Sequence, residues 1–479
     1  MEQEKRLLQN TVIYAIGNFG SKLLSFLLVP LFSFYVTRED FGTYDIIVIT
    51  ATLMVPIVTL QLSDGVYRWL LDVAMKKVSL HISTVVSSSA FIILMNLVVL
   101  AVVFYVARSY FLRGLENGWL LLNYLFSLCL LPYFQQIARG LQQNRLYAAA
   151  GIVNSLILVI CNVVFLVVFN WGLKALLLSM VIANYIVIAV IAYRIGFLRY
   201  LSIKCFDRRI AYKLVFYSVP LIPNIISWWL ISSANRYIII NYLGEDENGI
   251  FAMAVRITAI LVMVNSIFSL AWQESAITEY SSQNRDSFYS KIFKYYFRLE
   301  LVAIIVLLPV TKIIILYFVD GTFGEAWKYT PFLYLGVAFS AFSAFLGTGY
   351  LSTKSTMGAF YTTIFGSVVN LIVSFSLIKS YGLFGAAVGS MVGFLVTWIL
   401  RVFQTRRFFT LNFNFGDFVK LFMLFLISTT AIYFIDDFGY LLFLTLILVI
   451  ICGLLYRADV KAISYYFKNK ILKKKLNKA

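Results

Sequence analysis

Charged side chains are scarce in this chain of 479 residues. They make up 13% of it, against about a quarter in an average soluble protein. Hydrophobic residues make up 61%, and the mean hydropathy is +0.87. A water-soluble fold of this size could not bury so much apolar surface, whereas a bilayer accommodates it. We therefore expect an all-α polytopic membrane protein, because helices satisfy their own backbone hydrogen bonds in lipid.

Residues that bind metals or do covalent chemistry are also few. The chain has one histidine, His81, and four scattered cysteines, with no CxxC, HExxH or Cys/His spacing. This excludes the common zinc motifs and a disulfide framework. No GxxxxGK[ST] sequence is present, so the chain lacks a P-loop ATPase site of its own. We expect no catalytic residues, no metal and no cofactor.

Long apolar runs are abundant, and fourteen of them could cross a bilayer. They lie at about 11–36, 43–71, 82–107, 117–138, 148–170, 173–194, 213–241, 250–275, 294–318, 328–350, 357–379, 383–405, 418–435 and 439–456. No connecting segment exceeds roughly two dozen residues, so any chemistry would have to take place in or on the membrane.

The basic residues indicate how these spans are oriented. Of the 40 Lys and Arg, 29 fall in the two tails and in alternate loops, 7 in the opposite loops and 4 within spans. Cytoplasmic segments carry such an excess, so we expect a bacterial inner-membrane protein with both termini in the cytoplasm. Topology also explains the net charge of +18. The basic tail is expected to contact anionic membrane lipids, not nucleic acid.

The chain contains a weak internal repeat. Residues 35–44 resemble 242–251 at an offset of 207, and Trp171-Gly172-Leu173 resembles Tyr381-Gly382-Leu383 at an offset of 210. A third match, at an offset of 211, relates 179–181 to 390–392. The repeat predicts two parallel halves, as in many secondary transporters.

The repeat and the apolar runs together predict four parts. They are a six-helix bundle at 1–200, a second at 201–412, an accessory transmembrane helix pair at 413–456 and a basic cytoplasmic tail at 457–479.

Four cations lie within the spans, where charge is costly and usually functional. They are Lys22, Arg68, Arg236 and Arg256. Lys22 is too deep for its stem to reach either surface. It shares a polar helical stripe with Asn18, which indicates a water-filled cavity. The alternative is a structural ion pair between Lys22 and an acid of a neighbouring helix.

The other candidates lie in the second, seventh and eighth spans. Asp64 and Arg68 are spaced to pair on one helix face, and a structural pair is as good an explanation there as a binding role. Trp229 shares a face with Arg236, and a tryptophan beside hydroxyls and a cation suits a sugar or a phosphate. An interfacial anchor is the alternative for this tryptophan. Arg256 has no acid within helical reach in its own span.

The N-terminal region resembles the polysaccharide transporters, the O-antigen and capsule flippases of the multidrug/oligosaccharidyl-lipid/polysaccharide exporter superfamily. The resemblance rests on the entry at Asn10, on Pro30, on Phe41-Gly42-x-Tyr44 and on the segment 60–68 (LQLSDGVYR). It implies a V-shaped pair of bundles around a central cavity lined by spans one, two, seven and eight. Flippases of lipid-linked sugars are expected to have a cationic cavity for the pyrophosphate.

The resemblance leads us to expect a non-enzymatic flippase. Its substrate would be an undecaprenyl-pyrophosphate-linked oligosaccharide, moved to the outer leaflet for O-antigen, capsule or exopolysaccharide synthesis. A polysaccharide polymerase and chain-length machinery would be further partners. The candidate binding residues are Lys22, Arg256, Arg236, Arg68, Asp64, Asn18 and Trp229. The alternatives are a multidrug exporter, which should have an acidic cavity, and a membrane-embedded polymerase or acyltransferase.

Overall fold

The computed structural model confirms an all-helical membrane protein. It describes residues 20, 24, 28–76, 79–110, 118–280, 282–353, 357–412 and 415–457, and these contain no strand. Thirteen of the helical segments in this part are long and apolar enough to cross a membrane. The first expected span, 11–36, lies mostly outside the described residues.

The described helices begin and end as follows. In the first part of the chain they are α2 (Arg38–Val58), α3 (Leu62–Lys76), α4 (Ser79–Tyr110), α5 (Gly118–Gly140), α6 (Asn144–Asn162), the π-helical η1 (Val163–Val168), α7 (Gly172–Ile195), α8 (Phe197–Tyr200), η2 (Ile203–Cys205), α9 (Arg208–Ser218), η3 (Val219–Leu221), α10 (Ile222–Ser233) and α11 (Asn235–Leu243). In the second they are α12 (Glu245–Glu279), α13 (Arg285–Phe318), η4 (Gly321–Phe323), η5 (Ala326–Tyr329), α14 (Thr330–Ser352), α15 (Met357–Tyr381), α16 (Leu383–Thr405), α17 (Phe415–Phe434) and α18 (Phe438–Leu455).

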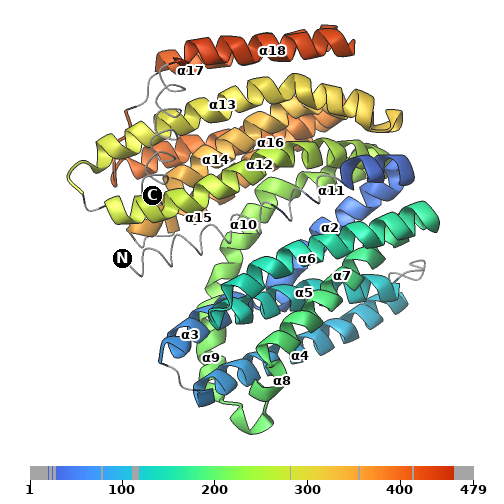
Figure 1. The fold of residues 1–479 in the computed structure, drawn as a ribbon, viewed down its shortest axis with the longest axis vertical. Coiled ribbons are helices and arrows are strands. Elements are labelled where there is room, and N and C mark those ends of the chain that lie inside the picture. Colours follow the sequence, from blue (N-terminus) through green and yellow to red (C-terminus); the bar gives the residue numbers. More distant parts are fainter. Residues whose placement is uncertain are drawn as a thin grey trace, which may run out of the picture.

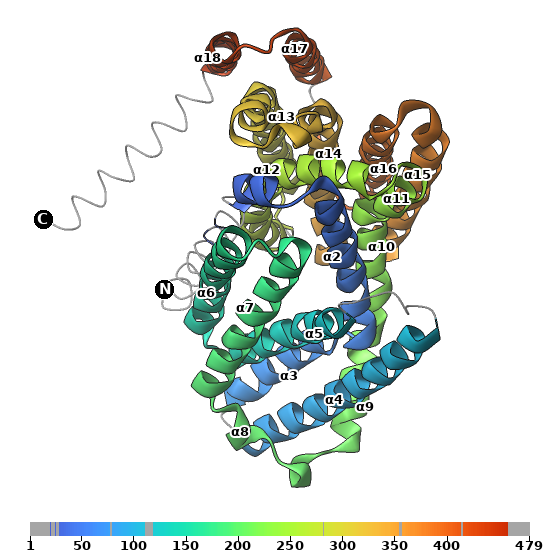
Figure 2. The same ribbon diagram turned by 90° about the vertical axis from the view of Figure 1, so that its right-hand side faces the viewer.

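The long helices form two groups that are joined by crossing segments. Figure 1 shows α3–α8 in the lower group and α12–α16 in the upper group. Figure 2 shows the run α9–α11 passing from one group to the other. Along this run α9 packs against α3 and α4, whereas α10 and α11 pack against α15. Helix α2 also bridges the groups, because it contacts α12 on one side and α5 and α7 on the other. The predicted division of the chain into one bundle at 1–200 and a second at 201–412 remains a prediction.

Two of the expected spans are broken, and both breaks lie beside prolines. The span expected at 43–71 is two helices, and α2 ends two residues after Pro56. Leu60 and Gln61, which follow, have φ angles of 51° and 52°, an uncommon conformation for residues other than glycine. The span expected at 213–241 is interrupted by η3, between α9 and α10, near Pro220 and Pro223. A proline removes a helical hydrogen bond and crowds the preceding turn, which accounts for both breaks.

The internal repeat has a counterpart in the backbone. Gly172 and Gly382 open α7 and α16, and their φ angles are +50° and +56°. Only glycine adopts this region at little cost. The two repeats therefore place a glycine with positive φ at the start of corresponding helices.

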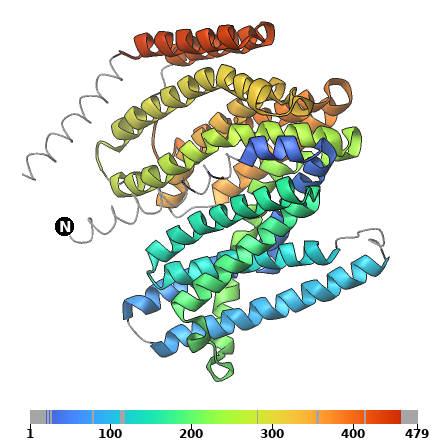
Figure 3. The ribbon, with the colours of Figure 1, turned by 45° about the vertical axis from the view of Figure 1, so that its right-hand side comes forward.

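The last two helices are fastened to α13 at two places, one near its middle and one near its C-terminal end. Arg298 pairs with Asp417 at the start of α17. The buried Lys312 pairs with Asp436 at 2.7 Å and lies 4.0 Å from the ring centre of Trp327. Figure 3 shows α17 and α18, in red, on the outer side of the upper group, beside α13.

Candidate substrate-binding cavity

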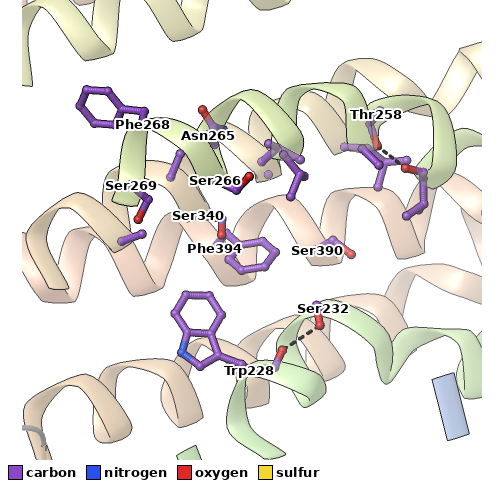
Figure 4. Close-up of a pocket in the computed structure, with 18 of the residues that line it drawn as sticks. Trp228, Ser232, Thr258, Asn265, Ser266, Phe268, Ser269, Ser340, Ser390 and Phe394 are labelled. Atoms are coloured by element: carbon purple, nitrogen blue, oxygen red, sulfur yellow. Dashed lines mark hydrogen bonds between the residues drawn. The ribbon is translucent and has the colours of Figure 1, made fainter. Parts of the chain in front are cut away.

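The upper group contains a cavity of about 420 Å³, walled by α10, α11, α12, α13, α14 and α16. Its lining runs along α12 from Val255 to Trp272, about 25 Å at 1.5 Å per residue. Aromatic rings and hydroxyls alternate around it, and Figure 4 shows several of them pointing into one space. The aromatic members are Trp228, Phe268, Trp272, Tyr296, Phe345 and Phe394. The polar members are Ser232, Thr258, Asn265, Ser266, Ser269, Ser340 and Ser390.

The charged side chains of the described lining are of one sign only. Among the described residues the wall contains one cation, Arg236, and no aspartate or glutamate. Arg236 is paired behind the wall with Asp45, whose carboxylate lies 3.5 Å away, but it is the only charged group in the described lining, and an arginine there favours an anionic ligand. The described lining is thus suited to an anionic ligand with polar, hydroxyl-rich parts and poorly suited to a cationic one.

The cavity ends below a region where the two groups are held together, which we call the closed end. It comprises residues 36–44, 244–250 and 319–325. Thr43 donates to a Glu245 carboxylate oxygen at 2.5 Å, and Asn248 donates to the Gly42 carbonyl at 2.9 Å. Arg38 donates to the Thr322 carbonyl at 2.5 Å and lies 3.6 Å from Asp246.

A further link at the closed end involves Asp320. Its backbone N–H donates to the Ser33 hydroxyl at 3.1 Å. The hydroxyl and backbone N–H of Thr322 donate to the Asp320 carboxylate, and these bonds lower its pKa. Asp320 therefore stays ionised and caps the short helix η4.

The closest approach at the closed end is reciprocal. A Cβ on Gly42 would overlap the Glu245 carbonyl, and a Cβ on Gly249 would overlap the Arg38 carbonyl. Gly42 and Gly249 are repeat equivalents at the offset of 207, and so are Arg38 and Glu245. The beginnings of α2 and α12 thus meet through the same surface of each half, as in a two-fold symmetric contact.

Arg236 lies at the junction of the cavity and the closed end. It is 5% exposed and its Nε lies 3.5 Å from an Asp45 carboxylate oxygen. One terminal nitrogen, Nη1, donates to the Ser232 carbonyl at 2.6 Å, and the guanidinium lies 5.2 Å from the Phe251 ring centre. Arg236 is therefore anchored from α2, α10 and α12 while still lining the cavity.

Arg256 occupies an aromatic cage formed by the other half of the chain. Its guanidinium lies 4.8 Å from the ring centre of Phe32, 5.2 Å from Phe41 and 5.9 Å from Tyr44. Its Nη1 is buried and has no hydrogen-bond partner among the described residues. Rings hold a cation without neutralising it, so this nitrogen retains an unused donor between the two halves.

The two adjacent tryptophans of α10 face different ways. Trp229 donates from its indole nitrogen to the Ile49 carbonyl of α2 at 2.8 Å. Trp228 lines the cavity. The structure thus places Trp229, which the sequence singled out, against α2, and it adds Trp228 as a wall residue.

The remaining predicted site residues lie apart from this junction or outside the described part. Asp64 accepts a hydrogen bond from the Gln61 side chain at 2.9 Å on α3. Arg68 is exposed on the same helix. Lys22 and Asn18 lie outside the described residues, so their proposed roles remain predictions.

Two buried ionisable residues border the cavity without lining it. Arg401 of α16 is 2% exposed, and its guanidinium lies 5.5 Å from the Trp228 ring centre. Glu300 of α13 is fully buried and accepts a hydrogen bond from Asn265 at 2.6 Å. Arg401 was not among the four cations that the sequence placed within spans, because it lies only four residues before the end of α16 at Thr405.

The described residues contain no group of three or more His, Cys, Asp and Glu that could hold a metal ion.

Comparisons with known proteins agree with this geometry. The family model described as "Polysaccharide biosynthesis protein" matches residues 7–273, more than half of the chain. No curated protein sequence matches.

Solved structures share the fold at low sequence identity. The lipid II flippase MurJ in an inward closed conformation has a TM-score of 0.69 at 14% identity, covering 94% of this chain and 100% of its own. An inward-facing MATE multidrug transporter has a TM-score of 0.61 at 18% identity, and the match covers 83% of this chain and 94% of the transporter. A mutant MATE transporter from Vibrio cholerae has a TM-score of 0.55 at 12% identity, covering 85% and 98%.

The family match covers the first half of the chain, where the sequence resemblance was noted, and the structural similarity extends the fold over the second half. The chain is therefore a multi-pass membrane protein of the polysaccharide biosynthesis protein family, with the fold of the multidrug/oligosaccharidyl-lipid/polysaccharide exporter superfamily.

Proposed function

We propose that the protein is a flippase for undecaprenyl-pyrophosphate-linked oligosaccharides. It would move repeat units of an O-antigen, capsule or exopolysaccharide from the cytoplasmic to the outer leaflet of the bacterial inner membrane. One observation carries the proposal: the described cavity lining holds an arginine, rings and hydroxyls but no acid. Family membership supports the same class of function.

The chemistry of the substrate explains why such a cavity is needed. Its head group is a pyrophosphate dianion with sugars, and moving it bare through hydrocarbon would be prohibitive. Arginine replaces lost water around phosphate with charge-assisted, often bidentate hydrogen bonds. Arg236 is available at the cavity wall, and Arg256 keeps an unused donor nearby. In our proposal Lys22 joins them as the central contact. The polyprenyl tail remains in lipid.

The closed end provides the moving contact of an alternating-access cycle. In the proposed cycle the halves 1–200 and 201–412 rock about the site. Contacts between α2 and α12, such as Thr43–Glu245 and Asn248–Gly42, seal one side and break when that side opens. Given the distribution of basic residues, the sealed side is the outer one. The driving force in this scheme is an ion gradient or the membrane potential.

The main alternative is export of organic cations, since MATE transporters share the fold. An exporter of cations needs acids in its cavity to replace the water that the cation loses. The described lining has none. We therefore rank lipid-linked glycan above organic cations as the substrate.

Deleting the gene tests the proposal. Lipid-linked repeat units should accumulate on the cytoplasmic leaflet, and surface polymer should be lost, measured by lipid extraction and surface glycan staining. Susceptibility to lipophilic cations should not change. Unchanged surface glycan and unchanged lipid intermediates, in a strain without a paralogue, would refute the flippase assignment. Increased susceptibility to cations would favour the exporter instead.

A further inference from the structure

Trp228 presents its ring to the cavity from a position that is unusually well fixed. Its neighbour Phe394 lies on the opposite wall, with ring centres 6.5 Å apart. Figure 4 shows the Trp228 ring pointing into the space that Phe394 and Ser340 face. Both rings belong to helices of the second half of the chain, α10 and α16.

The ring is supported from behind by Arg401. The guanidinium lies 5.5 Å from the Trp228 ring centre and 5.9 Å from that of Tyr350. Arg401 donates to the Ser343 carbonyl of α14 at 2.7 Å and to the Thr363 hydroxyl of α15 at 3.0 Å. The cation is therefore fixed by two helices besides its own, and through its cation–π contact it holds the tryptophan ring in place.

Hydroxyl groups line the same cavity as this ring, and two of them are not engaged elsewhere. Ser232 donates to the Trp228 carbonyl and Ser390 to the Ala386 carbonyl. Ser269 and Ser340 line the cavity and make no hydrogen bond within the described part of the chain. Each is only partly buried. Both hydroxyls are therefore free to donate to, or accept from, a ligand.

An immobile aromatic ring with free hydroxyls nearby is the chemistry that recognises a sugar. A pyranose has an apolar C–H face, which packs on an indole, and a hydroxyl rim, which needs hydrogen bonds in a buried site. An organic cation would also pack on the ring, but Arg401 behind it and Arg236 on the same wall disfavour positive charge there.

We propose that the pocket formed by Trp228, Phe394, Ser269 and Ser340, which we call the Trp228 chamber, binds a sugar ring of the lipid-linked head group. Arg401 is a positioning residue for Trp228. The pyrophosphate stays at Arg236, at the other end of the same cavity. This inference rests on the flippase assignment and adds to it a separate site for the glycan.

Binding measurements on the purified full-length protein in lipid nanodiscs test the chamber. The probes are undecaprenyl pyrophosphate carrying the host's own repeat unit, extracted from a deletion strain, and bare undecaprenyl pyrophosphate. The wild type should bind the glycan-bearing lipid more tightly. Trp228→Leu should weaken that binding by about tenfold and leave binding of the bare lipid unchanged. Trp119→Leu is the control, because Trp119 is 72% exposed and lies far along the chain on α5.

Two further variants separate stacking from folding. Trp228→Tyr keeps a ring and should retain most of the preference for the glycan, and Ser340→Ala should reduce it severalfold without altering the ring. The chamber is refuted if Trp228→Leu and Ser340→Ala both keep the wild-type preference, or if each weakens both lipids equally. A wild type that binds neither lipid would instead refute the flippase assignment.

Discussion

Arg236 has a structural role in the fold and, in our proposal, a second role in binding the ligand. Its pairing with Asp45 and its 5% exposure are features of a structural residue. Its place in the cavity wall is that of a ligand-binding residue. The carboxylate of Asp45 is only partly buried, at 21% exposure. An incoming phosphate can therefore compete with it for the guanidinium without leaving an isolated carboxylate in a dry site.

Substitution distinguishes these functions. Losing one charge-assisted contact to phosphate costs about 1.5–3 kcal/mol, so Arg236→Gln should lower export about ten- to a hundredfold. Asp45→Asn leaves the cation in place and should lower export much less. Export of labelled repeat units is the readout, with membrane abundance as the control. If the pair is only structural, both variants should lose export equally, and the double variant Arg236→Gln, Asp45→Asn should regain it.

Among the features of single residues, the direction of a side chain was the hardest to predict from the sequence. The sequence indicated that span seven carries a functional tryptophan, yet Trp228, not Trp229, lines the cavity. Trp228 lines the cavity together with Ser232 and Arg236, at spacings of four, and Trp229 fits the same polar stripe at a spacing of three, so helical spacing alone could not decide between the two tryptophans. The Arg236–Asp45 pair joins residues 191 positions apart, so helical spacing within one span could not reveal it.

At the scale of elements, the start of α2 and the start of α12 form the contact that, in our proposal, opens and closes. Gly42 and Gly249 are required there because each lies against a backbone carbonyl of the other half. A backbone carbonyl cannot move aside as a flexible side chain can. A methyl group at either position must therefore push the two helix starts apart.

We predict that Gly42→Ala and Gly249→Ala both prevent the closed end from sealing and abolish most export while the protein stays in the membrane. A cysteine pair replacing Thr43 and Glu245 reports on the contact, since their side chains lie within hydrogen-bond distance. Its crosslinking should drop in both alanine variants. Gly151→Ala is the matched control, because nothing lies within 4 Å of the added Cβ. Normal crosslinking and export in the Gly42 and Gly249 variants would contradict the reciprocal contact.

Most of the helices follow from the sequence, since their apolar runs have the length that a bilayer requires. The repeat also located the turns at Gly172 and Gly382, whose shared positive φ explains why glycine stands at both. Pro56, Pro220 and Pro223 indicate that spans two and seven can bend, and both spans are broken beside these prolines. Proline marks where a helix can bend, but Pro132 and Pro309 lie inside continuous helices, so tertiary packing decides which proline interrupts its helix.

At the scale of the whole molecule, the two helix groups differ in chemistry. The described cavity is walled by α10 to α14 and α16, which all lie after residue 200. The N-terminal residues Asp45, Phe32, Phe41 and Tyr44 contact Arg236 and Arg256 from the other side. Separating the groups would expose both arginines while leaving the cavity wall intact. In our proposal, opening and exchange of the anionic ligand are therefore linked in one movement.

Reconstituted transport tests the flippase assignment most directly. Purified protein is placed in vesicles that contain the lipid-linked repeat unit in both leaflets, and the fraction accessible to an external glycosidase is followed with time. The account predicts that the repeat units of the inner leaflet, which the glycosidase cannot reach at first, become accessible in vesicles with the wild type. They should stay protected in vesicles with Gly42→Ala and in protein-free vesicles. A protected fraction that persists with the wild type, under both an imposed ion gradient and an imposed membrane potential, would contradict it.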